Sequence, residues 1–158
     1  MAREGLEWRK KLTPATPAHE FKFGKVPEFS GEKIPSPEFF QYMGAVRGGM
    51  TYLASPYKSH GKVAMSVAKT RAKATLHLTI RLLDAGICVF SPIVYGTPFD
   101  NAGLARSSEW WLKRDIEFLR RCDSLTVHAL PGWRESPGVL KEMDWALLNQ
   151  KPIYVVRF

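Results

Sequence analysis

The chain has 158 residues, a formal net charge of +8 and a sequence pI of about 9.7. Its length fits one domain, and its 45% hydrophobic and 24% charged residues are typical of a globular protein. No apolar run approaches the roughly 18 residues that cross a membrane, and the polar N-terminus does not resemble a signal peptide. We therefore expect a cytoplasmic protein without a membrane partner.

The positive charge favours an anionic partner, either a nucleic acid or a small phosphorylated molecule. Lysine and arginine are scattered along the chain and form no basic block, so nucleic acid is an unlikely partner and a solvated basic surface is an equally good explanation. The two cysteines and four histidines lack the spacing of metal ligands or of a disulfide framework. We expect no metal and no cofactor.

Residues 1–49 differ from the rest of the chain, because they are rich in proline and glycine and show little periodicity. This composition predicts an extended N-terminal arm, with a short helix around residues 4–12. The segment MTYLA, which begins at Met50, is predicted to start a folded domain that covers residues 50–158. The arm could pack on its own domain or reach a partner subunit.

From Met50 onward, strand-like and helix-like segments alternate. Strands are predicted at 50–54, 87–90, 124–130 and 152–158, and helices at 61–86, 107–122 and 137–148. A loop rich in Gly, Pro and Asn is predicted at 95–103. In the first helix, an apolar stripe is predicted to face the core: Ala64, Ala68, Ala72, Leu76, Ile80 and Leu83. The alternation predicts an α/β fold, with a parallel sheet of four or five strands and helices on both faces.

A site in such a sheet is expected beyond the carboxyl ends of the strands. Three of these ends carry polar residues: Ser55-Pro56-Tyr57-Lys58, Ser91-Pro92, and residues 132–136. The chain contains neither GxGxxG nor GxxxxGK[ST], so the usual dinucleotide and triphosphate loops are absent.

Two carboxylates lie on helix faces where an apolar residue would be expected. In the helix at 107–122, Asp115 is at the middle of the apolar face, and burial of a carboxylate is costly unless a partner compensates it. In the next helix, Glu142 lies on the same side as Val139 and Ala146.

Each carboxylate also has a structural explanation. Asp115 could accept hydrogen bonds from a loop or pair with an arginine, and Glu142 could be partly exposed between Lys141 and Asp144. Two inward carboxylates on helices that flank one strand nevertheless suit glycosidic chemistry, in which one acts as nucleophile or stabiliser and the other as acid or base.

The segment Ser136-Pro137-Gly138 is typical of a helix start, with serine as the N-cap and proline at the first helical position. N-capping alone would explain it. The N-terminus of a helix with an amide at glycine is also suited to bind an anion such as phosphate.

The segments YLASPY, RDIEFLRRCDSLTV and Ser136-x-Gly138-x-x-x-Glu142 together resemble the nucleoside 2-deoxyribosyltransferase superfamily over about residues 50–156. Within it, the chain is most similar to nucleotide N-hydrolases that cleave 5′-monophosphates. The resemblance implies a flavodoxin-like sheet, a homodimer and cleavage of the bond between C1′ and the base.

The resemblance also implies roles for individual residues. Glu142 matches the glutamate that attacks or stabilises C1′, Asp115 matches the aspartate that assists departure of the base, and Tyr52 matches the tyrosine that orients the glutamate. The remaining expected substrate contacts are Ser55, Tyr57, Lys58, Ser91, Ser136 and Gly138, of which the last two match contacts to the 5′-phosphate.

The favoured hypothesis is an N-glycosidase that acts on a nucleoside or deoxynucleoside 5′-monophosphate. With a second base as the acceptor in place of water, the same site would be a base-exchanging deoxyribosyltransferase. A second class of hypothesis is a nucleotide-binding or sensing module without catalysis, and a third is nucleic-acid binding through the basic surface and the arm.

Overall fold

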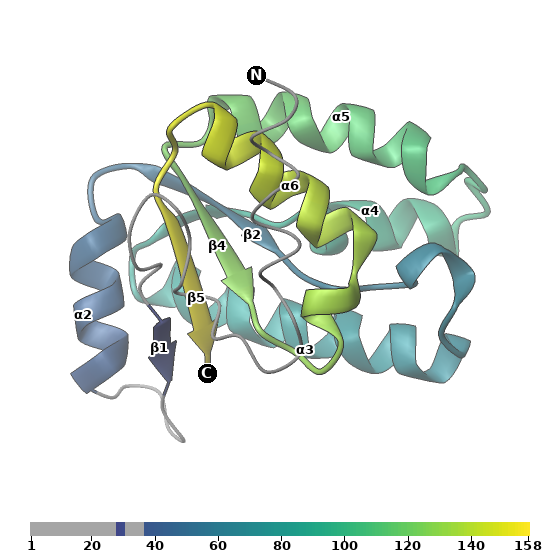
Figure 1. Cartoon of the computed structure of the whole chain (residues 1–158). Helices are drawn as coiled ribbons and strands as arrows, with labels where there is room; N and C mark the ends of the chain where they lie inside the picture. The colour runs from purple at the N-terminus through teal and green to yellow at the C-terminus, as the bar shows by residue number, and fades with distance from the viewer. Residues whose placement is uncertain (1–27, 31–36) are drawn as a thin grey trace.

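Five parallel strands form the sheet of this computed structural model, which describes residues 28–30 and 37–158. The strand order is β1-β5-β4-β2-β3, and the arrows of β1, β4 and β5 point the same way in Figure 1. The strands are β1 (Glu28–Ser30), β2 (Met50–Ala54), β3 (Cys88–Phe90), β4 (Ser124–His128) and β5 (Ile153–Arg157). Four of them lie within residues 50–158, as predicted.

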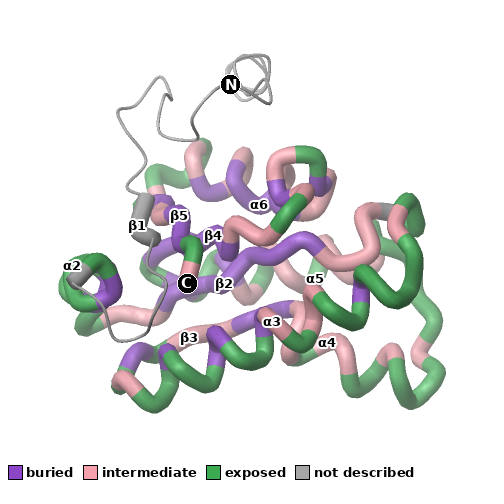
Figure 2. The backbone as a smooth tube through the Cα atoms, turned by 90° about the horizontal axis from the view of Figure 1, so that it is seen from below, coloured by how far each residue is buried: buried purple, intermediate pink, exposed green. Residues whose placement is uncertain are grey.

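Helices cover both faces of the sheet, and this prediction too is confirmed. The helices are α2 (Pro37–Val46), α3 (Met65–Asp84), α4 (Pro92–Asn101), α5 (Ser108–Arg121) and α6 (Pro137–Leu148), with short 3₁₀ turns η1 (Ser59–Gly61) and η2 (Trp133–Glu135). Because side chains alternate along a strand, Tyr52 packs with residues of α5 and α6, whereas Leu53 packs with residues of α2 and α3. Figure 2 shows the buried strands between α6 and α3.

The strand order creates one place where a crevice is expected. The chain passes from β2 to β3 on one side of β2 and then returns to β4 on its other side. In a flavodoxin-like sheet, the loops part at this switch point and leave a crevice at the carboxyl ends of the two central strands. Here those strands are β2 and β4, which pair in parallel from Thr51 to Ala54.

The predicted extended arm is wrong for part of residues 1–49. Helix α2 packs into the core, where Phe39, Tyr42 and Val46 are buried, and β1 pairs with β5 at the edge of the sheet. The Tyr42 hydroxyl makes a 2.8 Å hydrogen bond to Thr126 on β4, and Thr126 makes another, of 2.7 Å, to Thr51 on β2. The folded unit therefore begins before Met50. The predicted helix at 4–12 lies outside the described residues.

The apolar stripe predicted for the first long helix is also wrong. Of that stripe only Ala68 is buried, while Leu76, Ile80 and Leu83 are 43%, 45% and 54% exposed. The buried face of α3 instead carries Thr75 and Thr79 beside its leucines. Threonine is tolerated there because the Thr79 hydroxyl donates to the Thr75 carbonyl oxygen and the Thr75 hydroxyl donates to Ser55 Oγ.

Most of the predicted loop at 95–103 is helical. Helix α4 begins at Pro92, with Ser91 as its N-cap, and it continues through Gly96 and Pro98 to Asn101. The Ser91 hydroxyl accepts a hydrogen bond from the Val94 amide, and Tyr95 and Phe99 pack against neighbouring aromatic rings in tilted arrangements. Capping and aromatic packing outweigh the low helix propensity of glycine and proline. Among the described helices, none is long and apolar enough to span a membrane.

The role of α2 can be tested with Tyr42→Phe, which removes the hydroxyl that bonds to Thr126. We expect the free energy of unfolding to fall by about 1–2 kcal/mol, because Thr126 loses a buried hydrogen bond. Urea denaturation measures this, with Phe40→Ala on the exposed face of α2 as the control. Equal stability of Tyr42→Phe and wild type would show that the hydrogen bond from Tyr42 to Thr126 does not help to hold α2 on the sheet.

Candidate active site

A pocket with a cavity volume of about 150 Å³ opens where the switch point predicts a crevice. Its walls come from the β2–α3 loop, α4, α5 and the N-terminal half of α6. Seven of the nine predicted site residues line it: Ser55, Tyr57, Lys58, Asp115, Ser136, Gly138 and Glu142. The fold thus gathers residues that are up to 87 positions apart in the sequence, counted from Ser55 to Glu142.

Glu142 is held from beneath the pocket by Tyr52. The Tyr52 hydroxyl donates a 2.6 Å hydrogen bond to Glu142 Oε1, and Tyr52 is fully buried on β2. Glu142 lies in the second turn of α6 and is only 5% exposed. Tyr52 does not line the pocket itself, so it can position Glu142 but does not reach the cavity.

Burial raises the pKa of Glu142 to about 8. The hydrogen bond from Tyr52 acts in the opposite direction, because it favours the ionised carboxylate, and the charge of Asp115 raises the pKa further. The pKa of the Tyr52 hydroxyl is raised well above its usual value, first by burial and then by the charge of Glu142. The hydrogen-bond donor therefore stays protonated throughout the neutral range.

Asp115 faces the same cavity from α5. Burial raises its pKa to about 7. Its Oδ1 atom is buried and has no hydrogen-bond partner in the described part of the chain, and no ion pair there includes Asp115. The alternative in which Asp115 is neutralised by an arginine is thus excluded for the described residues. The charge of Asp115 also contributes to the raised pKa of Glu142, so the two carboxyls interact electrostatically.

The N-terminus of α6 presents unpaired donors to the cavity. Ser136 is the N-cap residue by backbone geometry, but its hydroxyl makes no capping hydrogen bond. The first amides of a helix have no intrahelical partner, and here those of Gly138 and Val139 remain available. A Cβ atom added at Gly138 would meet nothing within 4 Å, so the space beside it is open.

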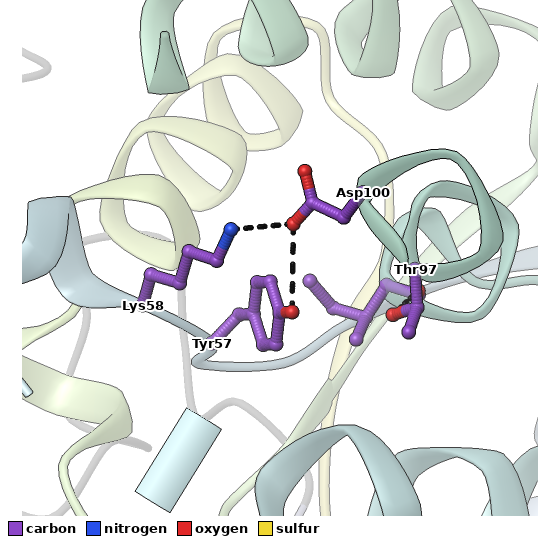
Figure 3. Close-up of polar contacts among 5 residues, drawn as sticks. Tyr57, Lys58, Thr97 and Asp100 are labelled. Carbon is purple, nitrogen blue, oxygen red and sulfur yellow. Dashed lines mark hydrogen bonds and ion pairs between the residues drawn. The ribbon is translucent and has the colours of Figure 1, made fainter. Parts of the chain in front are cut away.

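Tyr57 and Lys58 converge on an acidic residue of α4 that was not predicted (Figure 3). Lys58 Nζ lies 2.5 Å from Asp100 Oδ2, and the Tyr57 hydroxyl donates to the same oxygen at 3.5 Å. The Thr97 hydroxyl donates to the Ile93 carbonyl oxygen one turn earlier in α4. The β2–α3 loop is in this way tied to α4 across the pocket.

The two remaining serine predictions have different outcomes. Ser55 lines the cavity, and its Oγ accepts a 3.0 Å hydrogen bond from Thr75. Ser91 is buried, caps α4 and does not line the cavity, so its structural role is the start of a helix. Sequence reasoning missed several lining residues, chiefly Asp100, Arg106 and Trp111. Asp100 was placed in the predicted loop at 95–103.

Arg71 of α3 connects two loops that border the pocket. Its guanidinium donates to the Tyr57 carbonyl oxygen at 2.9 Å, to Ser59 Oγ at 3.2 Å and to the Pro131 carbonyl oxygen at 2.8 Å. Gly132 has φ of +87°, and a Cβ there would lie 2.5 Å from Arg71 Nη2. The positive φ favours glycine at this turn, and any larger residue would also force the end of the Arg71 side chain to shift.

Within the described residues, no group of three His, Cys, Asp or Glu side chains is arranged to hold a metal ion. The polar groups of the cavity are instead three carboxyls (Asp100, Asp115 and Glu142), hydroxyls, helix amides and three cationic side chains, Lys58, Arg106 and Lys141. This set suits a ligand that combines an anionic group with a centre that needs acid–base assistance.

Residues 49–157 match the model of a protein family described as a domain of unknown function, DUF1937. The chain belongs to the DUF1937 family. The matched range includes every residue of the pocket described above and omits β1 and α2. Among curated proteins, none matches the chain.

The raised pKa of Glu142 predicts how the stability of this DUF1937 chain depends on pH. The unfolded chain releases the Glu142 proton near its ordinary value of 4.5, whereas the folded chain holds it to about 8. Between these two pH values the folded state binds more protons than the unfolded state. The stability contributed by neutral Glu142 is therefore lost as pH rises from about 4 to 8. Glutamine carries no titrating proton and still accepts the hydrogen bond of Tyr52.

Glu142→Gln should therefore exceed wild type in free energy of unfolding by roughly 2 kcal/mol or more at pH 8, with the difference shrinking toward pH 4. Denaturant unfolding at several pH values measures this. Glu109→Gln, at an exposed position of α5, is the matched control and should leave the pH profile unchanged. Parallel profiles for Glu142→Gln and wild type would show that Glu142 titrates normally.

Proposed function

We propose that this chain is an N-glycosidase that cleaves the bond between the base and the sugar of a nucleoside 5′-monophosphate. The observation that carries the proposal is the buried carboxyl of Glu142, which Tyr52 orients toward a cavity that also contains Asp115 and the N-terminus of α6. The resemblance of the sequence to the nucleoside 2-deoxyribosyltransferase superfamily supports the same assignment of roles.

Glu142 supplies the negative charge that the reaction needs. Tyr52 occupies Oε1, so Oε2 is the oxygen free to face the substrate. As the bond from C1′ to the base breaks, its electron pair leaves with the base and positive charge develops on C1′ and the ring oxygen. An ionised Glu142 stabilises that charge or forms a bond to C1′, and water then completes hydrolysis.

Asp115 supplies the proton for the departing base. A carboxyl with a pKa of about 7 is protonated in a large share of molecules at neutral pH, which suits a general acid. Between the two deprotonation steps the two carboxyls together carry one proton, and the pKa values of about 8 for Glu142 and about 7 for Asp115 place it mainly on Glu142. The reactive form, with this proton on Asp115 and Glu142 ionised, is therefore the less populated of the two one-proton forms.

The N-terminus of α6 would bind the 5′-phosphate. The Ser136 hydroxyl and the Gly138 amide face the cavity without an intrahelical partner, and the helix dipole favours an anion there. If a second base replaces water as the acceptor, the same groups would serve a deoxyribosyltransferase. A nucleotide-binding module would use the phosphate contacts alone and would not need the carboxyl pair.

Incubation with a panel of nucleosides and their 5′-monophosphates, followed by chromatography of free base, tests the proposal. We expect release from monophosphates at least tenfold more efficient than from nucleosides, because charged hydrogen bonds contribute roughly 1.5–3 kcal/mol each. Glu142→Gln should lower the rate about 100-fold or more, while Glu109→Gln should not. Binding of monophosphates without release of base from any of them would favour the binding module.

Asp115→Asn should slow release most for bases that are poor leaving groups and least for activated ones, because protonation matters most when the base departs reluctantly. In wild type, kcat/KM should fall on the alkaline side as Asp115 and Glu142 lose their last shared proton. That alkaline limb should disappear in Asp115→Asn. An equal loss for all bases with an unchanged pH profile would assign Asp115 a purely structural role.

A further inference from the structure

The ion pair between Lys58 and Asp100 lies in the wall of the pocket. Its 2.5 Å contact joins side chains that are 38% and 17% exposed, and both residues line the cavity (Figure 3). The two side chains are therefore in close contact with each other and still accessible to a ligand. The proposed reaction does not use Asp100, although its carboxylate is part of the same cavity as the groups that act on the substrate.

Lys58 is a pocket cation whose loop contacts the helix that carries the proposed phosphate site. It directly precedes η1, and η1 packs against α6, whose N-terminus presents Ser136 and Gly138. Arg71 holds the segment around Lys58, because its guanidinium donates to the Tyr57 carbonyl oxygen on one side and to the Ser59 hydroxyl on the other. A chain of phosphates that extends outward from the N-terminus of α6 would use the ammonium of Lys58 as its next partner.

The charges of the cavity limit how many phosphates it can accept. Three cations line it, Lys58, Arg106 and Lys141, and Asp100 is the acid whose side chain is already engaged with one of them. Below pH 7, burial keeps Asp115 and Glu142 largely protonated. The remaining excess is two positive charges, which is close to the charge of one phosphate monoester at this pH.

We propose that Asp100 is a specificity-determining residue which, by neutralising Lys58, limits the anionic group of the substrate to a single phosphate. This inference rests on the proposed function, because it assumes that the pocket binds a nucleotide. A second phosphate would add about one negative charge to the ligand. Lys58 is already paired with Asp100, and the carboxylate of Asp100 would repel that second phosphate. Nucleoside diphosphates and triphosphates are thereby rejected in favour of monophosphates.

Binding of inorganic phosphate and of pyrophosphate to the full chain tests this without any measurement of base release. Titration calorimetry at one pH below 7 and one low ionic strength compares wild type, Asp100→Asn, Lys58→Met and the double variant. Asp84→Asn is the matched control, because it removes the same charge from an exposed position at the end of α3, away from the cavity. Asp100→Ser is a second neutral variant, and circular dichroism verifies the fold of each.

We expect wild type to bind phosphate at least as tightly as pyrophosphate. Asp100→Asn and Asp100→Ser should tighten pyrophosphate binding about tenfold and phosphate binding less, because the freed ammonium is near the outer charge. Lys58→Met should weaken the binding of pyrophosphate more than the binding of phosphate. In the double variant, Lys58→Met should abolish the tighter pyrophosphate binding that Asp100→Asn produces alone. Asp84→Asn should match wild type.

A purely structural ion pair gives a different result. It would make Asp100→Asn weaken both anions in parallel or leave both unchanged, and either outcome would overturn the proposal. A gain that survives Lys58→Met, or an absence of anion binding in both wild type and Asp100→Asn, would overturn it as well. If these binding results contradict the role of Asp100, the proposal that Glu142 acts in base release still stands. If no base is released, the preference for phosphate over pyrophosphate can still be measured.

Discussion

The buried hydrogen bond from Tyr52 to Glu142 is the interaction on which the rest of the site depends. A carboxyl at a 5%-exposed position is unfavourable, and the raised pKa of Glu142 is the direct expression of that cost. Glutamine at this position would fill the same space and accept the same hydrogen bond without the cost of ionisation. Stability alone therefore does not explain a glutamate at position 142. Buried ionisable residues with shifted pKa values are concentrated at functional sites.

The fold fixes this pair by placing both partners on rigid elements. Tyr52 is on β2, a central strand with neighbours on both sides, and Glu142 is in the second turn of α6 above it. The same switch point parts the loops after β2 and β4 and thereby opens the cavity in front of Glu142. Arg71 connects those two loops through their backbone carbonyls, and the absence of a Cβ atom at Gly132 leaves room for its guanidinium.

Much of this arrangement could be predicted from the sequence, because it depends on local signals. Strand β2 begins and ends where its apolar run predicts, and Ser136-Pro137 correctly marks the start of α6. The periodicity of α5 placed Asp115 on the inward face. The ends of parallel strands meet at one edge of a sheet, so residues at those ends could be grouped into one site before their distances were known.

The errors arose where the decisive contacts are distant in sequence. Ser91-Pro92 has the same capping signature as Ser136-Pro137, but Gly96 and Pro98 behind it suggested a loop, and the aromatic packing that stabilises α4 is tertiary. Helix α2 follows a segment rich in proline, and the hydrogen bond of Tyr42 to Thr126 spans 84 residues. The pairing of Lys58 with Asp100 spans 42 residues and has no local signature at all.

The distribution of charge in the cavity bears on whether the site catalyses or only binds. The cavity is lined by three cationic side chains, Lys58, Arg106 and Lys141. The pocket therefore contains cations that could pair with the buried carboxyls of Asp115 and Glu142. Lys58 is instead paired with Asp100, and in the described part of the chain neither Asp115 nor Glu142 takes part in an ion pair. A protein that needed only a stable nucleotide pocket would gain by pairing these acids or replacing them. Leaving them unpaired keeps their pKa values near neutrality, where one can give up a proton while the other retains it. That property is of no use for binding a phosphate, whereas cleavage of a glycosidic bond requires it.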